Sequence, residues 1–145
     1  MAVAYFDTSA LVKLVVDEPG TPIAQRAWND ADVVVSGLLT YPEGRAALAA
    51  ARRRRRLTAQ RHRAALDRFE GAWSALEVIE IAPMLARAAG DLADRLALRG
   101  YDGVHLAIAF RAAGPGGVLV TWDRELSRAA LAVGLAVVPS TRRPS

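Results

Sequence analysis

Short apolar runs alternate with longer helical patterns along most of the chain. The apolar runs favour strands at residues 2–6, 32–35, 77–81, 118–121 and 135–138. The helical patterns cover residues 9–16, 21–29, 40–56, 58–75, 83–98, 102–113 and 123–133. Strands that alternate with helices imply βαβ units with right-handed crossovers, so we predict an α/β fold with a mostly parallel sheet.

Proline and glycine mark the expected boundaries between these elements. Pro19 and Gly20 break the first helical pattern, and Ser36 with Gly37 is expected to turn the chain after the second strand. Pro83 suits the first turn of a helix, which we expect to stop at Gly100. The sequence shows no internal repeat and no low-complexity linker.

Length and composition restrict the kind of protein this is. A chain of 145 residues fits one domain, which we place at residues 1–140 with a short tail at 141–145. The absence of cysteine excludes disulfides and thiolate metal sites. The N-terminus lacks a basic segment, Asp7 interrupts its apolar run, and no long apolar stretch follows, so we expect a cytoplasmic protein without a membrane span.

The positive charge is concentrated in one stretch of the chain. The net charge is +4, and between Arg45 and Arg68 the only acid is Asp67. Five consecutive arginines within this stretch could neutralise the phosphates of a nucleic acid. These five, called the arginine run below, are Arg52, Arg53, Arg54, Arg55 and Arg56. A solvated helical face is the alternative, since Lys13 is the only lysine in a chain generally rich in arginine.

Two aspartates follow predicted strands directly. Asp7 comes after the first strand, and Asp123 comes two residues after the segment VLVT. In open α/β sheets, binding sites form beyond the carboxyl ends of the strands. Both residues also open predicted helices, where the helix dipole stabilises negative charge.

Each candidate acid also has a plain structural explanation. Asp7 and Asp123 could be ordinary helix N-caps, and Asp102 could cap the helix at 103–113. Glu43 completes the pattern Thr40-Tyr-Pro-Glu43, which matches a capping box. The argument for a site therefore rests on the joint placement of the four acids.

A gathered set of carboxylates would have a clear chemical use. Mg²⁺ and Mn²⁺ prefer oxygen ligands, and such ions activate water in phosphodiester hydrolysis. Without a cation, three or four clustered carboxylates would repel one another and take up protons. His105 lies three residues after Asp102, and we interpret it as a buried, hydrogen-bonded residue; His62, in the basic stretch, is interpreted as solvent-facing.

Four segments together resemble the PIN-domain ribonucleases, in particular the VapC toxins of bacterial toxin–antitoxin pairs. They are Phe6-Asp7-Thr8-Ser9-Ala10-Leu11, TYPEGRAAL around Glu43, LRGYDGVHLA around Asp102 and VTWDRELSRAA around Asp123. The resemblance spans nearly the whole chain and implies a three-layer α/β/α fold with a parallel sheet. It also implies a Mg²⁺- or Mn²⁺-dependent endoribonuclease toxin that cuts transfer or ribosomal RNA and halts translation.

The resemblance also assigns roles to residues. It implies that Asp7, Glu43, Asp102 and Asp123 form the catalytic quartet, with Asp7 and Asp102 as metal ligands and with Asp123 and Glu43 completing the site directly or through water. Thr8, Ser9 and Thr121 match supporting positions. Such toxins usually form homodimers and are silenced by a cognate antitoxin. Pro42 departs from the family pattern, and a shifted helix start before Glu43 is one consequence to test.

Other functions remain to be compared with this one. Haloacid-dehalogenase-type phosphatases and response-regulator receivers also place an aspartate after the first strand. Both rely on a lysine near a late strand, whereas Lys13 lies in the first helix. The non-enzymatic alternative is a catalytically silent module of the same fold that binds RNA or a partner protein.

Overall fold

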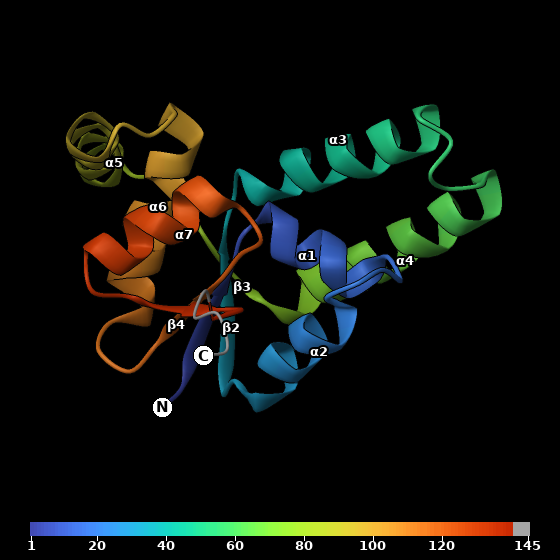
Figure 1. The fold of residues 1–145 in the computed structure, drawn as a ribbon, viewed down its shortest axis with the longest axis horizontal. Coiled ribbons are helices and arrows are strands. Elements are labelled where there is room, and N and C mark those ends of the chain that lie inside the picture. The colour runs from blue at the N-terminus through green and yellow to red at the C-terminus, as the bar shows by residue number, and fades with distance from the viewer. Residues whose placement is uncertain (141–145) are drawn as a thin grey trace, which may run out of the picture.

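The computed structural model describes residues 1–140, which form a five-stranded sheet with helices on both faces (Figure 1). The strands are β1 (Val3–Phe6), β2 (Val33–Gly37), β3 (Glu77–Ile79), β4 (Val118–Val120) and β5 (Ala136–Val138). The helices are α1 (Thr8–Val15), α2 (Thr21–Asp30), α3 (Thr40–Arg53), α4 (Ala59–Ala75), α5 (Pro83–Leu96), α6 (Gly100–Ala113) and α7 (Arg124–Ala132). The predicted tail at 141–145 lies outside the described residues.

The sheet has the strand order β3-β2-β1-β4-β5, and each pair of neighbouring strands is parallel. From β1, in the centre, the chain first builds the sheet outward through β2 and β3. It later returns to the other side of β1 with β4, where Tyr5 aligns with Leu119. The carboxyl ends of the adjacent strands β1 and β4 are therefore the topological switch point, where ligand-binding sites of α/β sheets commonly lie.

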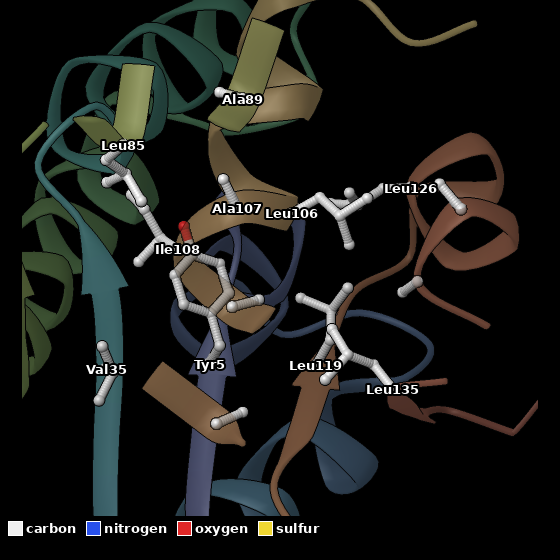
Figure 2. Packing of buried hydrophobic residues seen from close by; sticks show 14 residues of the cluster. Tyr5, Val35, Leu85, Ala89, Leu106, Ala107, Ile108, Leu119, Leu126 and Leu135 are labelled. Carbon is white, nitrogen blue, oxygen red and sulfur yellow. The ribbon is translucent and has the colours of Figure 1, made fainter. Parts of the chain in front are cut away.

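Two apolar cores lie on the two faces of the sheet, which confirms the predicted three-layer α/β/α sandwich. Successive side chains of a strand point to opposite faces. Accordingly, Tyr5 joins the core beneath α5, α6 and α7, while Ala4 and Phe6 join the core beneath α1, α3 and α4. Figure 2 shows the first core, with Tyr5 between Val35 and Leu119.

Helices α3 and α4 form a hairpin that extends away from the sheet (Figure 1). The hairpin is held at its base by Phe69 of α4, which is fully buried. Gly44 of α3 makes this contact possible, because a Cβ atom at that position would collide with the Phe69 ring. The turn between the two helices carries most of the arginine run.

The predicted helix at 40–56 was wrong at its end, because α3 stops at Arg53. The last part of the arginine run therefore belongs to the turn of the hairpin rather than to a helical face. Arg55 has a left-handed backbone conformation, with φ 58°, which no right-handed helix can contain. It is this residue that reverses the direction of the chain after α3.

Two other predicted boundaries were wrong. Ser36 and Gly37 do not turn the chain but extend β2, because they pair with residues 78 and 79 of β3. Helix α5 ends before Ala97, which adopts a left-handed conformation with φ 54°, so Gly100 is free to begin α6.

Within residues 1–140, none of the helices is both long and apolar enough to cross a membrane.

Candidate functional site

The four candidate acids all lie at helix N-termini on the carboxyl edge of the sheet. Asp7 follows β1 and is the N-cap of α1, and Asp123 follows β4 and is the N-cap of α7. Glu43 and Asp102 lie in the first turns of α3 and α6. Four helix dipoles thus present their positive ends to the same group of carboxylates, which lowers the cost of gathering negative charge.

Asp7 is held by three hydrogen bonds and is only 4% exposed. Its Oδ1 accepts the Ala10 amide at 2.9 Å and the Ser9 hydroxyl at 2.7 Å. Its Oδ2 accepts the hydroxyl of Thr121, which follows β4. Asp7 is therefore both an N-cap and a fixed carboxylate, so the structural and functional interpretations are compatible at this residue.

Thr121 and Ser9 also tie the Asp123 segment to Asp7. The Asp123 amide donates to Thr121 Oγ1 at 3.0 Å, and the Trp122 amide donates to Ser9 Oγ at 2.8 Å. The Asp123 carboxylate accepts only the Leu126 amide, at 3.0 Å, among the described residues. The hydroxyls at positions 9 and 121 thus fix two acids at once, across the switch point.

The capping-box interpretation of Glu43 was wrong. Thr40 is the first residue of α3, not its N-cap, and its hydroxyl is buried and hydrogen-bonded to Ser36 Oγ at 2.9 Å. The Glu43 carboxylate instead accepts Thr8 Oγ1 at 2.8 Å and pairs with His105 Nε2 at 2.7 Å. Pro42 lies in the first helical turn, where its missing N–H is not needed, so the helix still delivers Glu43 to the site.

Asp102 is the least satisfied of the four acids. It lies inside α6 rather than capping it, because Arg99 occupies the N-cap position. It is 5% exposed, and no described residue donates a hydrogen bond to its carboxylate. Burial, followed by the charge of Asp123, raises the pKa of Asp102 to about 6. This carboxylate is therefore the place where the site lacks positive charge.

The remaining site groups have pKa values that reflect burial and mutual contact. Burial raises the pKa of Asp7, although the charge of His105 and the Thr121 hydroxyl oppose this effect. Burial also acts against ionisation of Glu43, but its contacts with His105 and Thr8 prevail and lower its pKa. Burial alone would lower the pKa of His105, yet the Glu43 contact and nearby acid charges raise it.

The part of the chain that the structure describes holds no ready-made metal cage. Among residues 1–140, no three Asp, Glu or His side chains are grouped closely enough to hold an ion as they stand. The chemistry of the donors nevertheless fits a hard divalent cation, since they are all carboxylates, and burial together with the charge of Asp123 raises the pKa of Asp102. The side chains of Asp102 and Asp123, whose carboxylates have few hydrogen bonds, would have to move to bring the ligands together.

The sequence predicted only part of the hydrogen-bond network around His105. His105 is buried and hydrogen-bonded, as interpreted, but its partners Tyr5 and Glu43 were not foreseen. Tyr5 offered one signal, because it is a polar-tipped aromatic residue within an otherwise apolar strand. Arg99 was also missed: it is exposed at the rim, hydrogen-bonded to Tyr101 and close enough to the acids at positions 102 and 123 to feel their charges.

The arginine run is exposed at the tip of the α3–α4 hairpin. The helix rise of 1.5 Å per residue places it about 15 Å along α3 from Glu43. His62 was wrongly interpreted as solvent-facing, because its Nε2 atom is buried and has no hydrogen-bond partner among the described residues. The run therefore lies outside the carboxylate group but on an element that carries one of its members.

A groove of about 980 Å³ is lined by residues of the hairpin and of α1 and α2. Its lining includes apolar side chains such as Val12 and Leu57. The arginines that line it are Arg54, Arg56, Arg61 and Arg68. Arg52, Arg53 and Arg55 are exposed but do not line it, so the arginine run divides between the groove and the open tip of the hairpin.

Known proteins resemble this chain over most of its length. The PIN domain family model matches residues 4–131. Ribonuclease VapC49 of Mycobacterium tuberculosis is 42% identical over 144 residues, which cover 99% of this chain and 100% of that protein.

Solved structures have the same fold. The Mycobacterium tuberculosis toxin VapC20, described as cleaving the sarcin–ricin loop, superimposes with a TM-score of 0.67 at 18% identity, covering 92% of this chain and 96% of that one. A chain of a toxin–antitoxin complex from Klebsiella pneumoniae gives a TM-score of 0.59 at 22% identity, covering 83% of this chain and 86% of that one.

Proposed function

Because this chain belongs to the PIN-domain family, among its VapC ribonucleases, we propose that it is a metal-dependent endoribonuclease toxin neutralised by a cognate antitoxin. The observation that carries the proposal is the placement of Asp7, Glu43, Asp102 and Asp123 at four helix N-termini around one edge of the sheet. Capping explains Asp7 and Asp123 but leaves Asp102 buried without a hydrogen-bond donor among the described residues. A cation-binding role accounts for all of these features together.

Asp7, Asp102 and Asp123 are the residues that would hold the ion. Mg²⁺ or Mn²⁺ bound there would supply an activated water and stabilise charge on the phosphate oxygens. Asp7 is fixed by Ser9 and Thr121, so it provides a rigid ligand. Asp102 and Asp123 retain carboxylate oxygens without described donors, which leaves them available as ligands.

Glu43 has a different part in this proposal. Both of its described hydrogen bonds end on Oε1, so Oε2 is left without a donor among the described residues. The contacts with His105 and Thr8 lower its pKa, which keeps it ionised near neutral pH. Glu43 Oε2 is thus suited to accept a hydrogen bond from the attacking water and to hold that water in position.

The exposed arginines of the hairpin support the proposal that the substrate is RNA. Arginine side chains recognise phosphates, and the arginine run is exposed at a distance that a few nucleotides could span. Transfer or ribosomal RNA is the proposed substrate class, and the sarcin–ricin activity described for VapC20 makes ribosomal RNA a natural first test.

The lining of the groove beside the hairpin supports the proposal of a protein partner. Apolar side chains line it together with four arginines and two acids, which leaves an excess of positive charge: Arg54, Arg56, Arg61, Arg68, Asp17 and Glu18. An amphipathic segment with acidic residues would match this combination, and we propose that the antitoxin supplies such a segment. A homodimer remains a prediction from the family resemblance.

Cleavage of defined RNAs tests the proposal directly. Purified protein should cut transfer or ribosomal RNA with Mg²⁺ or Mn²⁺ and stop when EDTA is added. Asp7→Asn keeps an oxygen that can cap α1 but removes the charge, so we expect cleavage to be lost while the fold persists. Asp102→Asn should behave in the same way.

The alternative function is a catalytically silent module that binds RNA or a partner. It predicts RNA binding without products under any divalent ion, and unchanged behaviour after Asp7→Asn. Asp91→Asn, at an exposed position on α5, is the matched control and should retain wild-type cleavage. Full activity in Asp7→Asn would contradict the proposed site.

A further inference from the structure

Tyr5 has a hydroxyl group in the middle of an apolar core. Its side chain is 0% exposed, and Figure 2 shows the ring among Val35, Ile108 and Leu119. Burying a hydroxyl is unfavourable unless it is hydrogen-bonded. The Tyr5 hydroxyl lies 2.7 Å from Nδ1 of His105, on the first half of α6.

The surroundings of Tyr5 decide the direction of that hydrogen bond. Ser36 donates its one hydroxyl hydrogen to the Phe6 carbonyl at 2.6 Å, so Thr40 donates to Ser36 Oγ at 2.9 Å and its hydrogen is not available to the Tyr5 oxygen. The acceptor within reach of the phenol hydrogen is Nδ1 of His105, at 2.7 Å. Glu43 Oε1 is a carboxylate oxygen that can only accept, and it lies 2.7 Å from Nε2 of His105, so Nε2 carries a proton. When the imidazole is neutral and has a single N–H, Nδ1 is then the acceptor, and the Tyr5 phenol donates to it.

Nε2 of His105 is then a donor directed at Glu43. It lies 2.7 Å from Glu43 Oε1, and Thr8 Oγ1 donates to the same oxygen from 2.8 Å. One chain of hydrogen bonds thus runs from β1 through α6 to the first turn of α3. Only the last member of this chain, Glu43, belongs to the carboxylate group of the proposed nuclease site.

We propose that His105 is a positioning residue for Glu43 and that Tyr5, by fixing the ring tautomer of His105, is part of the same device. A glutamate at a partly exposed site has three rotatable bonds and samples several rotamers unless it is held. His105 and Thr8 together hold Oε1, which determines where Oε2 lies. The inference rests on the proposed function, because it concerns how that site keeps its geometry.

A direct catalytic role for His105 does not fit the geometry. Both ring nitrogens are occupied, one by Tyr5 and one by Glu43, and the residue is only 3% exposed. No nitrogen remains to exchange a proton with RNA or water. The contribution of His105 must therefore pass through Glu43.

Three substitutions at position 105 separate positioning from simple filling of space. Glutamine can place its amide nitrogen near the position of Nε2 and keep the bond to Glu43. Asparagine reaches only the position of Nδ1 and keeps the bond to Tyr5 instead, while leucine keeps neither. If the site is preorganised through Glu43, His105→Leu and His105→Asn should lower kcat by about 100-fold, and His105→Gln should stay within about 5-fold of wild type.

The effect should appear in kcat rather than in KM. The proposed role of Glu43 is to hold the attacking water, and Glu43 does not contribute to binding the rest of the RNA. Thermal unfolding of each variant measures the purely structural contribution. If kcat follows thermal stability rather than the ability to reach Glu43, the positioning proposal is overturned. If His105→Leu does not fold, the comparison of Gln with Asn still decides.

Tyr5→Phe tests the other half of the device. We expect a loss in kcat of about 10-fold in the wild-type background and no further loss in the His105→Leu background. Multiplying losses would show that Tyr5 acts independently of His105 and would overturn its part in the proposal. Tyr41→Phe, which removes a surface hydroxyl bonded to Glu70, is the control and should leave kcat unchanged.

A spectroscopic measurement separates this inference from the proposed function. Nitrogen-15 NMR of the metal-free wild-type protein, at a pH high enough for His105 to be neutral, should show the ring protonated on Nε2, and Tyr5→Phe should allow the other tautomer. An Nδ1-protonated ring in the wild type would overturn the inference even if RNA is cleaved. Conversely, absence of RNA cleavage with the Nε2 tautomer present would overturn the proposed function alone.

Discussion

Asp102 should destabilise the metal-free protein, so its replacement should increase stability while removing activity. The carboxylate is buried, accepts no hydrogen bond from a described residue and lies near the charge of Asp123. Asp102→Asn removes this charge with almost no change in volume. We therefore expect the variant to be more resistant to unfolding than the wild type when no divalent ion is present.

The size of the effect follows from the pKa. A rise from 3.8 to about 6 corresponds to about 3 kcal/mol at roughly 1.4 kcal/mol per pKa unit. Solvent screening of the acid charges reduces this figure, and the variant also loses about 0.3–1 kcal/mol of attraction to the N-terminus of α6. A net gain of about 1–2 kcal/mol remains, which would raise Tm by roughly 3–7 °C.

The sign of the pH dependence is specific. Because the pKa of Asp102 is higher in the folded than in the unfolded protein, the folded wild type takes up a proton as the pH falls through about 6. Above that pH, the free energy of unfolding of the wild type is therefore lower than that of Asp102→Asn by the full amount. This difference disappears towards pH 4 or so. The comparison should thus show a clear gap at about pH 7.5 and little gap at about pH 4.

Thermal unfolding in EDTA at both pH values is the assay. Mg²⁺ or Mn²⁺ should then raise the Tm of the wild type and leave that of Asp102→Asn nearly unchanged, which narrows the gap. Asp94→Asn, at an exposed position on α5, is the control and should shift stability by less than about 0.5 kcal/mol. A lower Tm for Asp102→Asn at neutral pH, or a gain independent of pH, would refute the electrostatic reasoning.

Three further predictions concern the rest of the molecule. Replacing the five residues of the arginine run by glutamine should weaken RNA binding and make it less sensitive to salt. In filter-binding titrations, the slope of log binding constant against log salt concentration should fall by roughly one unit for each phosphate that is no longer neutralised. An unchanged slope would mean that the run is only a solvated or antitoxin-facing surface. Gly44→Ala should destabilise the protein by about 1–3 kcal/mol in urea unfolding, because the added methyl group collides with Phe69, and a neutral result would mean that the hairpin can shift. Thr21→Val should cost about 1–3 kcal/mol in the same assay, since the buried hydroxyl donates its hydrogen to the Lys13 or the Val16 carbonyl, and Thr58→Val at an exposed helix cap should cost less.

The sequence determined the local elements and the acids at their ends. Period and breaker residues are local properties, so the alternation of strands and helices could be predicted before any contact was known. For the same reason Asp7 and Asp123 could be placed after β1 and β4, at the starts of helices. Boundaries were less secure where pairing partners decided them, as at Ser36, which stays in β2 because it pairs with Val78 of β3.

The end of α3 shows the same limit in the arginine run. Arginine is a good helix former, so the local pattern favoured a helix through position 56. The hairpin instead requires a sharp reversal so that α4 can pack Phe69 against α3, and Arg55 takes the left-handed conformation that this reversal needs. Packing between the two helices thus overrode the local preference.

Only the tertiary structure decided which of these residues meet. The sheet order brings β4 beside β1, so Thr121 reaches Asp7 across a separation of 114 residues. The pairing of Glu43 with His105 likewise joins α3 to α6, and it replaced the local capping box that the sequence favoured. Local patterns cannot encode such contacts, because they depend on how the helices pack on the sheet, and that packing is settled by the whole core at once.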